Sequence, residues 1–97
     1  MTTLRVRLRV RDYDMCRQAF GKDAAGRQAH GATEYRIFRL HEDPRRVELD
    51  VDFPTPTEAE KFLEAMRRDV WPDPGKAPAM LGSPETSILE VMETHAY

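Results

Sequence analysis

The chain has 97 residues and a formal net charge of −2 at pH 7, with 40% of its residues hydrophobic and 33% charged. This composition is typical of one globular domain, which we expect to span residues 1–97. A net charge this small gives no bulk attraction to nucleic acid or to a membrane surface, so neither is expected as a partner.

The single cysteine, Cys16, excludes an intrachain disulfide and a CxxC metal site. A chain without disulfides fits a reducing compartment. Its first residues lack the charged-then-apolar order of a signal peptide, and no apolar run approaches the ~20 residues of a membrane helix. We therefore expect a cytoplasmic protein.

Residues 4–11 alternate apolar side chains with arginines, a period of two that predicts a strand with one apolar and one arginine face. The pattern changes at Asp12, which is a good helix N-cap. Apolar residues then follow at helical spacing: Met15, Cys16, Ala19 and Phe20. The sequence predicts a first helix over about 13–28, bent near Gly21 or Gly26 because glycine weakens helix interiors.

A β-hairpin is predicted in the middle of the chain. Residues 33–40 are rich in β-forming side chains, and residues 46–53 alternate apolar with acidic side chains. The segment between them contains Pro44, which favours a turn, and its short length predicts an antiparallel pair.

A second helix is predicted over about 57–69, because residues 57–60 form a T-x-x-E capping box. Its apolar residues recur at helical spacing: Ala59, Phe62, Leu63, Met66 and Val70. Residues 71–84 contain four prolines and two glycines, which predicts a loop with a short turn over 78–81. The last strand is expected over 86–93.

The predicted order is β-α-β-β-α-β, and its commonest topology is the ferredoxin-like α+β fold. That fold has an antiparallel sheet of order 4-1-3-2 with both helices on one face. The other face then carries the arginines of the first strand beside the acids of the third: Arg5, Arg7, Arg9 and Arg11 beside Glu48, Asp50 and Asp52. Because nothing covers this face, we expect a homodimer formed through it.

Three stretches of the chain, residues 31–39, 46–53 and 57–63, resemble the dimeric α+β-barrel proteins of the antibiotic-biosynthesis-monooxygenase-like (ABM-like) group. In element order the resemblance covers nearly the whole chain. It implies a cofactor-independent monooxygenase or cyclase that acts on a small aromatic or polyketide-like substrate, with no bound metal or flavin. The alternative is a non-enzymatic dimeric protein that binds a small ligand or has an accessory role.

In ABM-like proteins the pocket lies under the helices, which here implies the first helix and the 71–84 loop. The candidate ligand contacts are Tyr35, Arg39, His41 and Trp71. Trp71 and Tyr35 can equally serve as amphipathic packing residues. The haem-degrading branch of the group combines an asparagine, a tryptophan and a histidine. The absence of asparagine from this chain argues against haem degradation.

The remaining residues offer no recognisable catalytic set. The histidines at 30, 41 and 95 lack metal-ligand spacing, and no nucleotide-binding loop or GxSxG elbow occurs. Cys16 is expected to be a small buried core residue rather than a nucleophile. The arginine–carboxylate face has two interpretations, the wall of a ligand cavity or an ion-pair ladder. DNA binding is disfavoured because the neighbouring acids cancel the arginine field.

Overall fold

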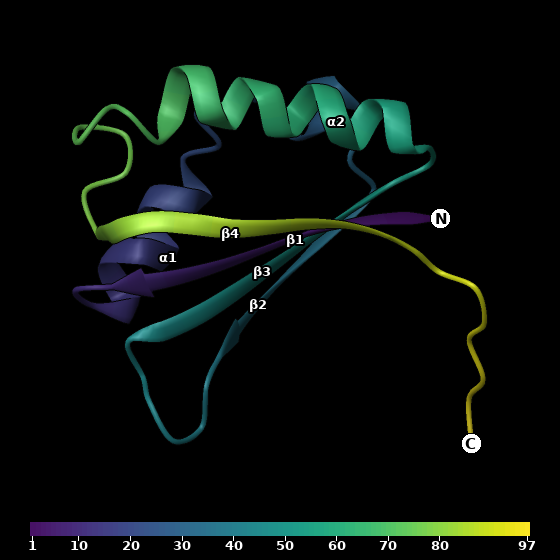
Figure 1. Ribbon diagram of the computed structural model, residues 1–97, viewed down its shortest axis with the longest axis horizontal. Coiled ribbons are helices and arrows are strands. Elements are labelled where there is room, and N and C mark those ends of the chain that lie inside the picture. Colours follow the sequence, from purple (N-terminus) through teal and green to yellow (C-terminus); the bar gives the residue numbers. More distant parts are fainter.

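The computed structural model describes all 97 residues as an α+β protein (Figure 1). Its elements are β1 (Thr2–Val10), α1 (Tyr13–Gly21), the 3-10 helix η1 (Gln28–His30), β2 (Glu34–Arg39), β3 (Arg46–Phe53), α2 (Pro56–Ala65), the π-helical turn η2 (Met66–Val70) and β4 (Met80–Glu90). The strands form one sheet in the order β2-β3-β1-β4, and every neighbouring pair is antiparallel. The predicted ferredoxin-like fold and sheet order are confirmed. No helix has the length and apolar character needed to cross a membrane.

Both helices pack against the same face of the sheet. Cys16 of α1 and Phe62 of α2 belong to one buried cluster with the apolar residues of β1 and β3. The strand residues of this cluster are Leu4, Val6, Val10, Val47, Leu49, Val51 and Phe53. Figure 1 shows α2 lying along one side of the sheet, while the C-terminal residues lead away toward the other side. We call that other side the open face.

The register between β1 and β3 aligns opposite charges on the open face. Arg5 lies opposite Asp50, and Arg7 lies opposite Glu48. Arg5 donates to both carboxylate oxygens of Asp50, at 2.9 and 3.0 Å. This hydrogen bonding, opposed by partial burial, raises the pKa of the Arg5 guanidinium above its usual range. The predicted pairing of the arginine strand with the acidic strand is confirmed.

The first helix is shorter than predicted. Asp12 is the N-cap, accepting from the Met15 amide at 3.0 Å, but α1 ends at Gly21 and only η1 follows before β2. Asp23 has φ +54°, a left-handed conformation that ends a helix instead of bending it. Its carboxylate then accepts from the Arg27 amide at 2.7 Å. This side-chain bond replaces the helical hydrogen bond that the prediction assumed.

The start of the second helix also differs from the prediction. The N-cap is Thr55 and Pro56 takes the first helical position, so the predicted capping box over 57–60 is wrong. Proline is preorganised for that position, because its missing N–H would be unpaired there in any case. The Thr55 hydroxyl instead lies 3.5 Å from a carboxylate oxygen of Glu58, on the same T-x-x-E spacing two residues earlier.

The last strand begins six residues earlier than predicted, at Met80 instead of residue 86, and ends at Glu90 instead of residue 93. Its pairing with β1 shifts between Arg7 and Arg9, which marks a bulge in β4, and Gly82 there has φ +70°. Pro84 is tolerated because β4 is an edge strand, where an amide can be missing from the outer side. The loop after η2 therefore covers only residues 71–79. The short turn predicted over 78–81 is present one residue earlier, where the Met80 amide donates to the Ala77 carbonyl at 3.4 Å.

Candidate ligand cavity

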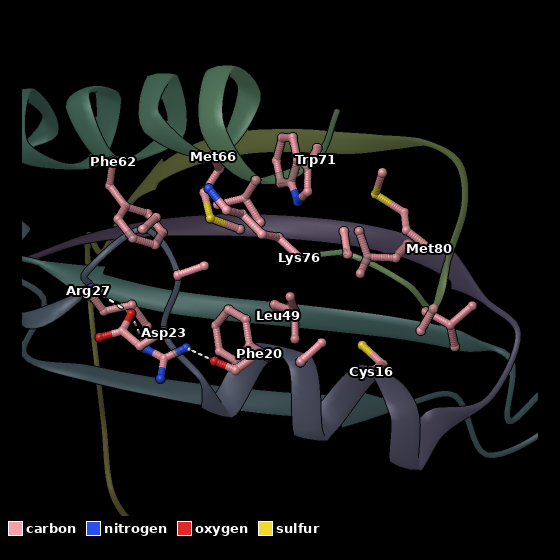
Figure 2. Close-up of a pocket in the computed structure, with 18 residues that line it drawn as sticks. Cys16, Phe20, Asp23, Arg27, Leu49, Phe62, Met66, Trp71, Lys76 and Met80 are labelled. Atoms are coloured by element: carbon pink, nitrogen blue, oxygen red, sulfur yellow. Dashed lines mark hydrogen bonds and ion pairs between the residues drawn. The ribbon is translucent and has the colours of Figure 1, made fainter. Parts of the chain in front are cut away.

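A cavity of about 60 Å³ lies between α1, the α2–η2 segment, the loop over 71–79 and the sheet (Figure 2). Fifteen of the eighteen residues that line it are hydrophobic, so the space is apolar. Ligand pockets for drug-sized molecules are typically about 300–1,000 Å³. An aromatic ligand therefore enters only if lining side chains move, and the flexible Met66 and Met80 border the space.

One side of the cavity is formed by the end of the second helix and the loop behind it. Figure 2 shows Met66, Trp71 and Lys76 on this side. The Trp71 amide donates to the Met66 carbonyl at 2.9 Å, which continues the π-helical turn and directs the half-buried indole toward the cavity. The Lys76 ammonium donates to the Asp69 carbonyl at 3.1 Å. The loop thus brings one aromatic ring and one cation to the same wall.

The opposite side comes from α1 and the turn after it. Cys16 and Phe20 face the cavity there, and Arg27 and Asp23 lie next to Phe20 (Figure 2). The Arg27 guanidinium lies 4.1 Å from the ring centre of Phe20 and 4.3 Å from that of Tyr35. It also donates to the Phe20 carbonyl at 2.6 Å and pairs with Asp23 at 3.5 Å. These contacts hold a largely buried cation at the cavity edge.

The four predicted ligand contacts are not brought together. Trp71 lines the cavity, whereas Tyr35, Arg39 and His41 are not among its lining residues. Tyr35 is 45% exposed and touches the site through Arg27 and through an edge-on contact with Phe20, whose ring centre lies 5.2 Å from its own. Arg39 stacks over the Tyr13 ring at 5.0 Å, and His41 is exposed on the β2–β3 hairpin.

Sequence reasoning missed three residues that border the cavity: Phe20, Arg27 and Lys76. Arg27 was not expected at the site, because a continuous helix over 13–28 would place it about two turns away from Phe20. No sequence pattern pointed to Lys76, because it lies in a loop without periodicity. The one signal was the pair of opposite charges at Asp23 and Arg27, which are four residues apart and form an ion pair at 3.5 Å.

Cys16 is a free, buried cysteine, as predicted. Burial raises the pKa of its thiol, because desolvation disfavours the thiolate. The thiol lines the cavity as a neutral, weakly polar group.

The raised pKa of Cys16 predicts a loss of stability in alkaline solution. The unfolded chain releases this proton first, near the ordinary thiol pKa of about 8.5, while the folded chain still holds it. The stabilising contribution of Cys16 is therefore complete below that pH and is lost as pH rises toward the folded pKa. The free energy of unfolding, measured with urea between about pH 7 and 10, should fall more steeply with pH for the wild type than for Cys16→Ala. Equal slopes for the two proteins would contradict this expectation.

No group of three or more His, Cys, Asp or Glu side chains is placed to hold a metal ion. His30 lies in η1 with its Nδ1 2.9 Å from the Gly26 carbonyl, and His95 stacks edge-on with Tyr97 near the C-terminus. The chemistry that the cavity offers is therefore apolar and aromatic contact, with two cations and one thiol at its border.

No protein-family model and no curated protein matches this chain. Several solved structures match it over nearly its full length. A protein from Nitrosomonas europaea, assigned provisionally as an antibiotic biosynthesis monooxygenase, is 18% identical with a TM-score of 0.70, covering 96% of this chain and 100% of that one. SnoaB, a cofactor-independent oxygenase from Streptomyces nogalater, is 14% identical with a TM-score of 0.69, over 96% and 94% of the two chains.

A third match is a dimeric ferredoxin-like protein from an uncultured marine organism, 8% identical with a TM-score of 0.66 over 100% of both chains. At these identities the likeness concerns the fold. The chain has the ferredoxin-like α+β fold of the antibiotic biosynthesis monooxygenase structures, as its resemblance to the ABM-like group implied.

Proposed function

We propose that this protein binds a small aromatic molecule in the cavity between its helices and sheet, and oxidises it as a cofactor-independent monooxygenase. The observation that carries the proposal is the pairing of aromatic walls with cations. Trp71 and Phe20 border an apolar space, and Lys76 and Arg27 lie at its edge. The fold shared with a cofactor-independent oxygenase supports the reaction class.

A phenolic ring suits this combination of groups. Its faces pack on Trp71 and Phe20, and a neighbouring ammonium or guanidinium favours its phenolate form. A phenolate is electron-rich enough to pass electrons to dioxygen directly. In the overall reaction a ring CH₂ and O₂ give a C=O and H₂O, so one oxygen atom enters the product and the other leaves as water. In this proposal Lys76 and Arg27 stabilise the phenolate, and Trp71 orients it.

The test uses a dihydroanthracene-type phenol under oxygen, followed by absorbance. Wild type is expected to turn it over. Lys76→Met is expected to lower kcat/KM by roughly 10-fold or more, because one favourable charge near the reacting oxygen is lost. Trp71→Ala is expected to raise KM, because the ring loses its packing surface. Lys61→Met, an exposed lysine on the outer side of α2, is the matched control. No turnover by wild type, or equal turnover by all variants, would defeat the proposal.

A non-enzymatic binding protein is the second candidate. One observation favours it: the only carboxylate at the cavity, on Asp23, is already engaged by Arg27, so no free base faces the ligand. Trp71 is the only tryptophan, and its fluorescence therefore reports ligand entry. Saturable quenching by the phenol without oxygen uptake would support this candidate over the oxygenase.

We also propose that the protein is a homodimer formed through the open face. The face carries exposed apolar side chains, Phe38 and Leu89, among its charges. A solved structure of the same fold is described as dimeric. Light scattering is expected to give about twice the 11.2 kDa chain mass. A mass of one chain at micromolar concentration would contradict this proposal.

A further inference from the structure

The segment that carries α1 and η1, residues 12–32, has no hydrogen bond or ion pair to the rest of the chain. Every such contact of its residues lies within the segment. Hydrogen bonds to the rest of the chain begin again directly outside it. The Arg11 amide donates to the Ala79 carbonyl and the Thr33 amide donates to the Asp52 carbonyl, both at 2.9 Å. We call residues 12–32 the flap, because hydrogen bonds fix it only at its two ends.

The flap is also the wall of the cavity with the least buried surface. Cys16 is its only buried residue, whereas α2 buries four residues and η2 buries two. The loop over 71–79 is tied down by hydrogen bonds, because Arg11 donates through Nε to the Pro78 carbonyl at 3.3 Å and through its amide to that of Ala79. Segments with few buried contacts and few bonds to their surroundings open before the rest of a protein does.

Two side chains of β2 hold the flap from outside the cavity. Tyr35 and Arg39 lie on the helix-covered face of this edge strand, since their partners on β3 are core residues. Tyr35 meets Phe20 edge-on at 5.2 Å between ring centres, and its own ring centre lies 4.3 Å from the Arg27 guanidinium. Arg39 lies 5.0 Å from the ring centre of Tyr13. Because such contacts are weak one by one, thermal motion can break them. We call Tyr35 and Arg39 the latches.

The size of the cavity requires that one wall move. Its volume is about 60 Å³, whereas an engineered cavity that binds benzene measures about 150 Å³. The sheet and α2 present side chains that are packed in the core, such as Leu49 at 3% and Phe62 at 2% exposed. Figure 2 shows Cys16 and Phe20 on the opposite side, both carried by α1. Since its hydrogen bonds are internal, the flap can move as one body without breaking any of them.

We propose that the flap moves outward to admit the aromatic ligand, and that Tyr35 and Arg39 control this step by holding the flap closed. This inference rests on the proposed function and describes how its site opens. The closed form excludes the ligand, so the apparent Kd equals the Kd of the open form divided by the fraction of open protein. Phe20 and Arg27 belong to the flap and still border the ligand after it moves. Loss of a latch therefore tightens binding, although neither latch lines the cavity.

The thiol of Cys16 reports opening without any ligand. It is the only cysteine of the chain and is 6% exposed, so iodoacetamide reaches it when the flap opens. At one pH, Tyr35→Leu and Arg39→Met are each expected to raise the labelling rate about threefold to tenfold. Tyr35→Phe keeps the ring and is expected to label at the wild-type rate. Tyr97→Leu makes the same change as Tyr35→Leu at a fully exposed position and is the matched control.

Low concentrations of urea separate opening of the flap from unfolding of the whole chain. Opening exposes little surface, so labelling through it changes little with urea, whereas labelling through unfolding follows the m-value of the chain. An unchanged labelling rate in both latch variants overturns the inference, and so does an increase that follows the full unfolding slope. Wild-type labelling as fast as in the unfolded chain also overturns it, because nothing would then close over the cavity.

Ligand binding gives a second readout, through quenching of Trp71 fluorescence by the dihydroanthracene-type phenol under nitrogen. Tyr35→Leu is expected to lower Kd by the same factor by which it raises the labelling rate. The gain is expected in the association rate, because the open form becomes more populated. A residue that only shaped the cavity would show the opposite sign, so a raised Kd in Tyr35→Leu overturns the inference.

The results distinguish this inference from the proposed function. Faster labelling of the latch variants, with no binding or turnover of the phenol by wild type, would defeat the proposed function and leave the flap in place. Turnover by wild type with unchanged labelling of both latch variants would leave the proposed function and defeat the flap. Thermal melting checks that each variant folds, and if one latch variant does not fold, the other decides.

Discussion

Replacing Phe53 with alanine is expected to lower the free energy of unfolding by about 3–5 kcal/mol, the usual cost of truncating a buried phenylalanine. Phe53 is 0% exposed at the end of β3, and its ring centre lies 5.5 Å from that of Phe62 on α2. The change removes one of the buried contacts between the sheet and the second helix. For a domain of this size the melting temperature should fall by more than about 10 °C.

The control for Phe53→Ala is Tyr97→Ala, because Tyr97 is a fully exposed aromatic residue. Its truncation is expected to change stability by no more than about 0.5 kcal/mol. Both variants are compared with wild type by urea unfolding at one protein concentration, since the proposed dimerisation would make stability depend on concentration. A loss below about 1 kcal/mol for Phe53→Ala would show that the core can close around the missing ring.

Replacing Asp50 with alanine is expected to cost about 2–3 kcal/mol. Asp50 is 1% exposed even though it lies on the open face, because Arg5 binds both its oxygens and Arg36 approaches to 3.7 Å. Its removal deletes two charge-assisted hydrogen bonds and leaves two arginines side by side. Because both arginines keep access to water, the cost stays below that of a fully buried unpaired charge.

Two variants test this account of Asp50. Glu48→Ala removes a carboxylate that is only partly buried, although it also contacts Arg5 at 2.8 Å, and is expected to cost about 0–1 kcal/mol. The double variant Arg5→Met/Asp50→Leu replaces the whole pair with apolar side chains and is expected to lose less stability than Asp50→Ala. A double variant that is less stable than Asp50→Ala would contradict the argument.

Local signals predicted most of the fold. The strand over 46–53 has the same bounds in the structure, because its alternation places every second side chain in the hydrophobic core and leaves no other register. The predictions failed where tertiary contacts override local propensity. Gly82 and Pro84 indicated a loop, but an edge strand with a bulge accommodates both.

Less of the candidate site could be predicted. Trp71 was a candidate because the resemblance to the ABM-like group implies an aromatic pocket residue just after the second helix. Arg27 and Lys76 come from segments whose actual conformation has no periodic signal. Arg27 reaches the cavity only because α1 ends at Gly21 and lets the chain fold back onto Phe20. A contact between residues in different segments depends on the path of the chain between them, which no local pattern records.

The sequence by itself determined the two faces of each central strand, the α+β class and the pairing of the arginine strand with the acidic strand, because alternation and opposite charge act between neighbours. Only the tertiary structure decided which side chains enclose the cavity, because they come from segments far apart in the chain. It also decided which charged side chains lie opposite one another on the open face. The strand register places Arg9 opposite Arg46 and Glu34 opposite Asp52, and register is a property of the assembled sheet.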